Sequence, residues 1–145
     1  MTLWIDADGC PVVKLAIGIG KAYQLPVVVV KNHAVYIDDA YAKVVTVDVS
    51  RDSADFYIVN HMASGDIVVT QDYGLAAMVL SRSGKCISQS GRLMTRDNIE
   101  LLLDQRHTSR VDRQKNRKYT KFKKRTEEEN LAFESMLKRL IESDL

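Results

Sequence analysis

Several aspartates follow short apolar segments of the kind that form buried β-strands. Asp6 and Asp8 follow the first segment, Asp48 follows a later one and Asp72 a third, while Asp55 lies in the helix expected after Asp48. The carboxyl ends of parallel strands meet at one edge of a sheet, where open α/β sheets bind ligands. We therefore expect these carboxylates to lie together. Because like charges repel, such a cluster requires protonation or a cation, and a divalent metal is the simplest solution.

Each aspartate also has a structural alternative. Asp8 and Asp72, taken singly, suit the N-cap of a helix, for which aspartate is a favoured residue. Asp48 alone could be an ordinary loop residue. The recurrence of aspartate after several strands favours the metal site, with Asp6, Asp48, Asp55 and Asp72 as ligands.

Strand and helix patterns alternate along the chain, and this alternation would position the aspartates. Strands are expected at residues 3–6, 27–30, 44–47, 67–70 and 85–88. The helix after Pro11 is expected to bury Val12, Leu15, Ala16 and Ile19, whereas residues 31–43 fit a loop or a short helix. Strands that alternate with helices indicate right-handed βαβ units and a mainly parallel sheet. The predicted fold is a three-layer α/β domain with about four or five strands flanked by helices.

Bulk composition is that of one ordinary globular domain covering residues 1–145, with 46% apolar and 28% charged residues and a net charge of +2. Two cysteines are too few for a disulfide scaffold and fit a reducing compartment. No apolar segment reaches the length needed to span a membrane. Aspartates interrupt the N-terminal apolar stretch, which argues against a signal peptide. The expected location is the cytoplasm.

The last third of the chain changes in character. Residues 106–125 form a basic segment with ten lysines and arginines against one acid, and a C-terminal helix is expected at about 126–142 with a capping box from Thr126 to Glu129. Cations interleaved with aromatic rings suit contact with nucleic-acid phosphates and bases, although such a segment could also be a solvated face. The candidate nucleic-acid contacts are Arg106, Arg110, Arg113, Lys118, Tyr119, Lys121, Phe122, Lys123 and Lys124.

Cysteine and histidine offer weaker signals. Cys10 at a helix start could have a lowered pKa and act as a nucleophile, but no suitable base or arginine pattern follows it, which favours a small buried thiol. The three histidines, His33, His61 and His107, show no mutual spacing typical of metal ligands.

Several segments resemble one bacterial family. Asp6-Ala7-Asp8-Gly9-Cys10-Pro11-Val12 is similar to the opening motif of the YaiI/YqxD family, whose members are uncharacterised proteins with a PIN-like fold. The resemblance continues through residues 52–55, the 65–72 block Gly-Asp-Ile-Val-Val-Thr-Gln-Asp, and residues 75–76, 91 and 98–99 to Arg106. It departs at residues 117–120, Arg-Lys-Tyr-Thr, where the family usually has a glycine-proline pair.

The wider resemblance is to PIN-domain nucleases, which cut RNA with an acidic cluster and Mg²⁺ or Mn²⁺. It implies a three-layer PIN-like domain and metal ligation by Asp6, Asp55 and Asp72, the last in the Thr-x-Asp signature at residues 70–72. The catalytic set implied is Asp6, Asp8, Asp55 and Asp72, with Asp8 or Asp48 orienting a water and single-stranded RNA as the partner. A further family acid has Asp38 or Asp39 as its candidate counterpart.

Two other functions compete with a nuclease. The first is a PIN-like module that binds RNA or a protein partner without cutting it. The second is a phosphatase of the haloacid-dehalogenase type, because Asp6-x-Asp8 after a strand resembles that nucleophile and acid pair. In phosphatases of that type a later acidic motif follows a strand, whereas Gly65-Asp66 precedes a strand in this chain. The chain also leaves little room for the cap domain of such enzymes. Nothing in the sequence defines an oligomeric interface.

Overall fold

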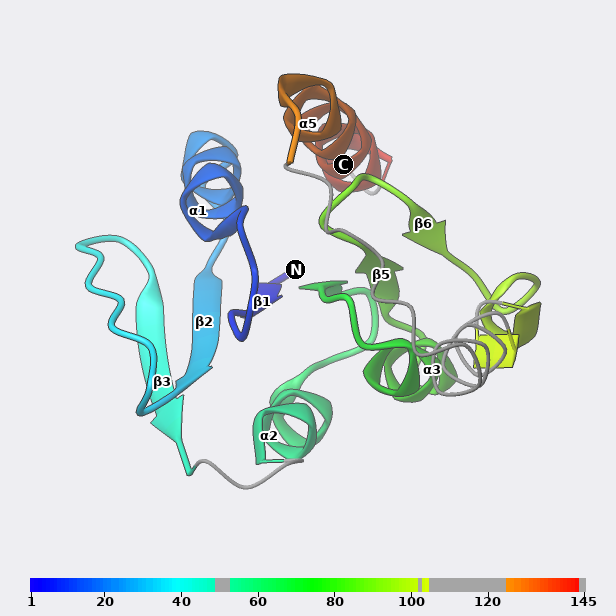
Figure 1. The fold of residues 1–145 in the computed structure, drawn as a ribbon, viewed down its shortest axis with the longest axis horizontal. Helices are drawn as coiled ribbons and strands as arrows, with labels where there is room; N and C mark the ends of the chain where they lie inside the picture. The colour runs from blue at the N-terminus through cyan, green and yellow to red at the C-terminus, as the bar shows by residue number, and fades with distance from the viewer. Residues whose placement is uncertain (49–52, 102, 105–124, 144–145) are drawn as a thin grey trace, which may run out of the picture.

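The computed structural model describes residues 1–48, 53–101, 103–104 and 125–143, in which strands and helices alternate around one sheet (Figure 1). The elements are β1 (Leu3–Asp6), α1 (Val13–Ala22), β2 (Val27–Asn32), β3 (Lys43–Val47), α2 (Ser53–His61), β4 (Ile67–Val69), α3 (Tyr73–Ser81), β5 (Lys85–Ile87), β6 (Leu93–Met94) and α5 (Glu127–Glu142). The six strands lie in the order β3-β2-β1-β4-β5-β6. All pair in parallel except β6, which is antiparallel to β5.

Helices cover both faces of this sheet. Helices α1 and α5 pack on one face and contact each other, while α2 and α3 pack on the other (Figure 1). The predicted three-layer α/β class is therefore confirmed. The sheet has one strand more than expected, because the two-residue pairing of β6 is too short to leave a sequence pattern. Within the described residues, no helix is long and apolar enough to cross a membrane.

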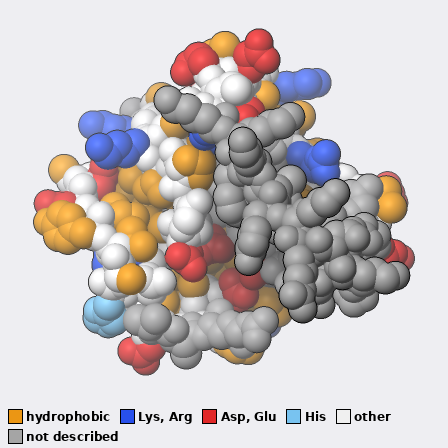
Figure 2. All heavy atoms as spheres, viewed as in Figure 1, with side chains coloured by type: hydrophobic (Ala, Val, Ile, Leu, Met, Phe, Trp, Pro, Cys, Tyr) orange, Lys and Arg blue, Asp and Glu red, His pale blue; other side chains and the backbone are white. Residues whose placement is uncertain are grey.

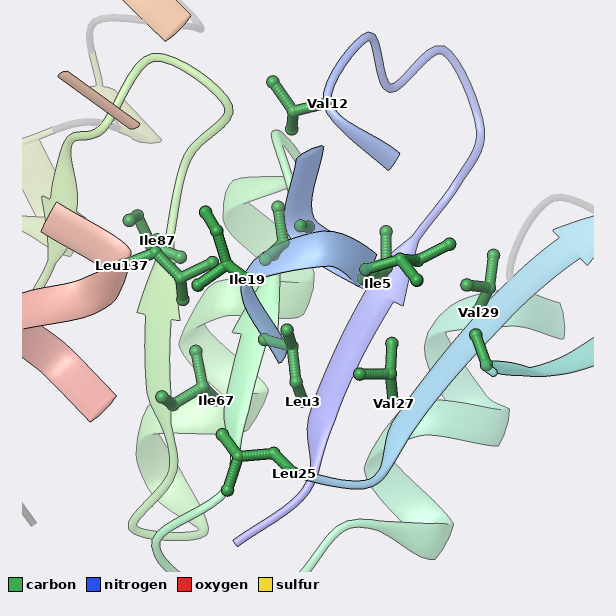
Figure 3. Close-up of a cluster of buried hydrophobic side chains, with 14 of the residues drawn as sticks. Leu3, Ile5, Val12, Ile19, Leu25, Val27, Val29, Ile67, Ile87 and Leu137 are labelled. Carbon is green, nitrogen blue, oxygen red and sulfur yellow. The ribbon is translucent and has the colours of Figure 1, made fainter. Parts of the chain in front are cut away.

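The central strand β1 is buried on both faces, and its side chains alternate between two cores. Leu3 and Ile5 point toward α1 with the aliphatic side chains of neighbouring strands (Figure 3). Trp4 points to the opposite face, toward α2 and α3. A strand between two helical layers needs apolar residues at every position, and this explains the unbroken apolar segments in the sequence. Asp6, where β1 ends, is the first position at which polarity returns.

Helix α1 differs in detail from its predicted form. It begins at Val13 rather than near Pro11, and no side chain caps it. Val12, Ala16 and Ile19 are buried as expected, but Leu15 is only half-buried. Gly20 is buried instead, and a Cβ added there would lie 2.5 Å from Cγ2 of Val27. The glycine therefore lets α1 approach β2 more closely than the apolar pattern alone would indicate.

The C-terminal helix α5 folds back onto the body, as the sequence predicts. Thr126 and Glu129 form a capping box at its start. Its buried stripe packs into the core shared with α1, through Phe133, Leu137, Leu140 and Ile141. The nine candidate nucleic-acid contacts from Arg106 to Lys124 lie outside the described residues. Arg125, just after them, donates to the carbonyl oxygen of Gln89 over 2.6 Å and so ties the helix start to the loop after β5.

A buried carboxylate joins the start of β1 to the start of β4. Asp66, only 5% exposed, accepts hydrogen bonds from the backbone N–H of Thr2 at 2.9 Å, the indole N–H of Trp4 at 3.0 Å and the backbone N–H of Ala63 at 2.9 Å. The sequence marks this residue only as part of a helix-ending turn. Three N–H donors satisfy the carboxylate, so its role is structural.

We predict that Asp66→Ala lowers the free energy of unfolding by about 3–5 kcal/mol, because three N–H groups lose their acceptor at once. Urea denaturation followed by circular dichroism measures this change. Asp38→Ala, which removes an exposed carboxylate elsewhere, serves as the control and should change stability by less than about 0.5 kcal/mol. A loss below about 1 kcal/mol in Asp66→Ala would contradict a structural role.

Candidate functional site

One pocket of about 280 Å³ collects all five of the candidate aspartates. They come from different elements: Asp6 ends β1, Asp8 follows it, Asp48 follows β3, Asp55 lies in α2 and Asp72 precedes α3. Figure 2 shows acidic side chains near the middle of one face of the molecule. The structure thus brings together residues up to 66 positions apart (Asp6 to Asp72). Their chemical roles stay predictions.

The pocket lies at the carboxyl edge of the parallel strands, beside the point where the chain reverses its direction across the sheet. From β1 the chain adds β2 and β3 on one side, and then crosses to place β4 on the other side of β1. Open α/β sheets bind ligands in the crevice that such a reversal creates. Asp6 and Asp72 lie at this position because they follow the adjacent strands β1 and β4.

Thr70 connects these two aspartates. Its hydroxyl donates to Oδ2 of Asp6 over 2.8 Å, and its Oγ1 accepts the backbone N–H of Asp72 over 3.0 Å. Thr70 is 2% exposed, so this arrangement is held in the protein interior. The Thr-x-Asp pattern of the sequence therefore has a physical function here: the threonine orients the Asp6 carboxylate while fixing the backbone that carries Asp72.

The capping alternative proves correct for Asp72 and wrong for Asp8. Oδ1 of Asp72 accepts from the backbone N–H groups of Gly74 at 2.8 Å and Leu75 at 3.2 Å, so Asp72 is the N-cap of α3. The N-cap of α1 is Val12, and Asp8 is exposed beside the pocket. Capping does not exclude a second role for Asp72, because a carboxylate has two oxygens and several lone pairs.

Repulsion within the pocket is visible at Asp6. Burial raises the pKa of its carboxyl most, and the charges of Asp72 and Asp8 raise this pKa further. The hydrogen bond from Thr70 acts in the opposite direction but does not cancel the other effects. An added cation would therefore stabilise the ionised form of Asp6.

A lysine that sequence reasoning missed lines the same pocket. Lys31, near the carboxyl end of β2, is only 9% exposed. Its ammonium makes one long hydrogen bond, 3.4 Å to the carbonyl oxygen of Asn32, which also lines the pocket. In sequence it is simply a charge after four valines, and only the parallel pairing of β2 with β1 places it near the aspartates.

The carboxylate oxygens of this pocket are chemically suited to bind a hard divalent cation. Carboxylate oxygens are the ligands that Mg²⁺ and Mn²⁺ prefer. Among the described residues, however, no three His, Cys, Asp or Glu side chains are placed to hold a metal ion together. Mg²⁺ commonly keeps several waters and uses only one or two protein carboxylates with substrate phosphates. A divalent ion at this pocket would therefore need waters or substrate oxygens to complete its coordination.

Other candidates lie elsewhere. Asp38 and Asp39 line a different pocket of about 710 Å³, so neither supplies the missing acid. The side chain of Asp39 accepts from the backbone N–H groups of Tyr41 and Ala42, and residues 33–42 form a loop without a helix. Cys10 lines this second pocket too, and burial raises the pKa of its thiol, which disfavours a nucleophile. His61 stacks on Tyr57 instead.

Comparison with known proteins agrees with the resemblance in the sequence. Residues 4–143 match the model of the family described as "Uncharacterized BCR, YaiI/YqxD family". The chain belongs to this family. A UPF0178 protein of Alkaliphilus oremlandii is 47% identical over 137 residues, covering 94% of this chain and 88% of that protein. A UPF0178 protein of Exiguobacterium sibiricum is 46% identical over 141 residues, covering 97% and 96%. No solved structure matches the chain significantly, so the PIN-like relationship stays a prediction.

We predict that Asp6→Asn stabilises the metal-free protein at neutral pH. A carboxyl with a raised pKa in the folded state favours folding at low pH, and this contribution is lost as the pH rises through that pKa. Asparagine keeps an oxygen that accepts from Thr70 but carries no charge. Urea denaturation in EDTA should therefore show a stability gain near pH 7 that disappears as the pH falls below the ordinary range of aspartate.

At each pH, the free energy of unfolding of the wild type is subtracted from that of Asp6→Asn. This difference cancels the contributions of other groups, including Asp39, whose pKa is lowered by backbone hydrogen bonds. Asp38→Asn, outside the pocket, should show no such dependence on pH. Equal stability of Asp6→Asn and the wild type across this range would refute repulsion at Asp6.

Proposed function

We propose that the protein is a divalent-metal-dependent nuclease that hydrolyses phosphodiester bonds of single-stranded RNA. The observation that carries this proposal is the single pocket lined by five aspartates at the carboxyl edge of β1 and β4. Hydrolysis of a phosphodiester requires charge stabilisation at the phosphoryl group and an activated water. Family membership supports a common role for the same residues but names no activity.

The residues divide naturally into two groups. Asp6, Asp55 and Asp72 would hold Mg²⁺ or Mn²⁺, directly or through water, and Thr70 would keep Asp6 in place. When bound, the ion would polarise a phosphoryl oxygen and lower the pKa of a nearby water. Asp8 and Asp48 are both exposed at the pocket, and one of them would orient this water and accept its proton. The water oxygen bonds to phosphorus as the bond to the leaving ribose oxygen breaks.

An acidic pocket repels RNA unless other groups attract it. The basic segment at residues 106–125 has the composition for this task, with ten cations and the aromatic side chains Tyr119 and Phe122. Its sequence supports the RNA proposal through charge and stacking chemistry. Small phosphate esters would not need so long a basic segment.

A module that binds RNA without cutting it is the second candidate. It is favoured by the lack, within the described chain, of three side chains preassembled around a metal, and by the use of Asp72 as a helix cap. Cleavage of RNA separates the two functions directly.

We predict that labelled single-stranded RNA is cut with Mn²⁺ or Mg²⁺ and not in EDTA, and that Asp72→Asn slows cutting by about 100-fold or more. Changing residues that merely support a metal ligand already costs about 10- to 100-fold, so loss of a ligand should cost at least as much. Asparagine is as good an N-cap as aspartate, so α3 should survive the substitution.

Asp38→Asn, which removes a carboxylate outside the pocket, is the matched control and should cut like the wild type. A cleavage rate that Asp72→Asn leaves unchanged would point to a contaminating nuclease. Binding without cutting would support the second candidate instead.

We also predict that Mn²⁺ raises the thermal stability of the wild type more than that of Asp6→Asn. An ion that binds only the folded state at 100 times its dissociation constant adds about 2.7 kcal/mol to the free energy of unfolding. Removing one carboxylate weakens this binding, so the gain should shrink. Melting curves across a Mn²⁺ titration measure it, and identical shifts in both proteins would place the ion elsewhere.

A further inference from the structure

We infer that Lys31 is the phosphate-binding residue of the aspartate pocket, with its ammonium bound to a nonbridging oxygen of the RNA phosphodiester. This inference rests on the proposed function and adds to it the group that would receive the substrate in an otherwise acidic site. It assigns a role to a side chain that directly follows the strand predicted at residues 27–30 and that the structure places within β2.

The burial of Lys31 requires a reason. Lys31 is 9% exposed as a whole residue, and burying a charged side chain is unfavourable unless partners replace the water. Lysine has three donors, yet within the described residues the ammonium of Lys31 makes a single hydrogen bond, the 3.4 Å contact with the Asn32 carbonyl. The described chain gives Lys31 no ion pair. Lys31 lines the pocket, and its ammonium lies by Asn32, another lining residue, with donors left for a ligand.

A purely structural role as counter-charge explains less. A lysine that served to neutralise the aspartates would form an ion pair with one of them. Lys31 forms no direct pair with these aspartates within the described chain. A cation that lines the pocket without pairing is suited to an anion that arrives from outside.

Phosphate fits the two types of charge in this pocket. A divalent ion on the aspartate side and the ammonium of Lys31 on the β2 side would contact different oxygens of the same phosphate. The ammonium would fix the phosphate relative to the waters held near Asp8 and Asp48. Lysine serves here as a point charge, which suits a phosphate that moves during the reaction.

The test compares Lys31→Met with Lys43→Met in binding a fluorescein-labelled oligouridylate by anisotropy with Ca²⁺ present. Methionine keeps the linear shape of lysine and removes its charge. Lys43 is exposed at the opposite, amino-terminal end of β3, and the same change there alters the net charge equally. Lys31→Met should bind about 10-fold or more weakly, as expected for a lost hydrogen bond to a charged group.

The dependence of binding on salt provides a readout that a structural role would not change. Loss of one phosphate contact should lower the slope of log Kd against log salt concentration by about 0.7 for a single strand. Lys31→Arg should restore both affinity and slope, and Lys43→Met should retain both. Mn²⁺ should bind Lys31→Met more tightly than wild type, because the repelling ammonium has gone. An unchanged slope in a folded Lys31→Met would overturn the inference.

A measurement on the unmodified protein covers the case in which Lys31→Met fails to fold. NMR of protein labelled at the lysine Cε carbons should show a shift of the Lys31 signal when the oligouridylate is added, and an unmoved signal refutes the contact. Failure of the nuclease is distinguishable. If the protein does not cut RNA but Lys31→Met lowers the salt slope of binding, Lys31 is still supported as the phosphate ligand. If the protein cuts RNA but Lys31→Met leaves this slope unchanged, the nuclease stands and the role of Lys31 is rejected.

Discussion

The parallel pairing of β1 with β4 is the constraint on which the rest of the molecule depends. Two carboxylates lie at its opposite ends: Asp66 before β4 and Asp6 at the end of β1. Asp66 accepts from three N–H groups in the protein interior, whereas Asp6 accepts from the Thr70 hydroxyl and the backbone N–H of Asp8 and lines the pocket. Similar side chains on the same pair of strands thus lie in different surroundings. The closed set of N–H donors makes Asp66 a structural carboxylate, and access to the pocket leaves Asp6 able to meet a ligand.

The carboxyl end of the β1–β4 pair, where Asp6 lies, is held by the same contacts that build the fold. Thr70 orients Asp6 and anchors the backbone of Asp72, and Asp72 starts α3 by capping it. The helix, the strand end and the pocket therefore cannot be moved independently. Preorganisation of this kind holds like charges near one another before any ligand arrives, at a cost in stability that the buried core of β1 offsets.

The sequence predicts the fold well because the central strands β1, β2 and β4 are largely buried and carry unbroken apolar segments, such as residues 27–30. The sequence also predicts which aspartates share an edge of the sheet, because parallel strands that run in the same direction end at the same edge. It does not predict β6, which is two residues long, or the network of Asp66, two of whose three donors are 62 and 64 positions away. Lys31 is missed for the same reason: its burial depends on tertiary pairing, and a lysine after a strand has no pattern that marks it as buried.

Charge balance determines how the two candidate functions relate to each other. Among the described residues, the pocket is lined by five carboxylates and one ammonium, and a phosphate would add further negative charge. A nuclease and a module that holds RNA in this pocket both require a cation there, because one lysine cannot offset the aspartates and the phosphate together. A module that only binds RNA could take this positive charge from the basic segment at residues 106–125, whereas the proposed nuclease needs the divalent ion itself. The difference between them is whether Asp8 and Asp48 can orient a water once phosphate, ion and Lys31 are in contact.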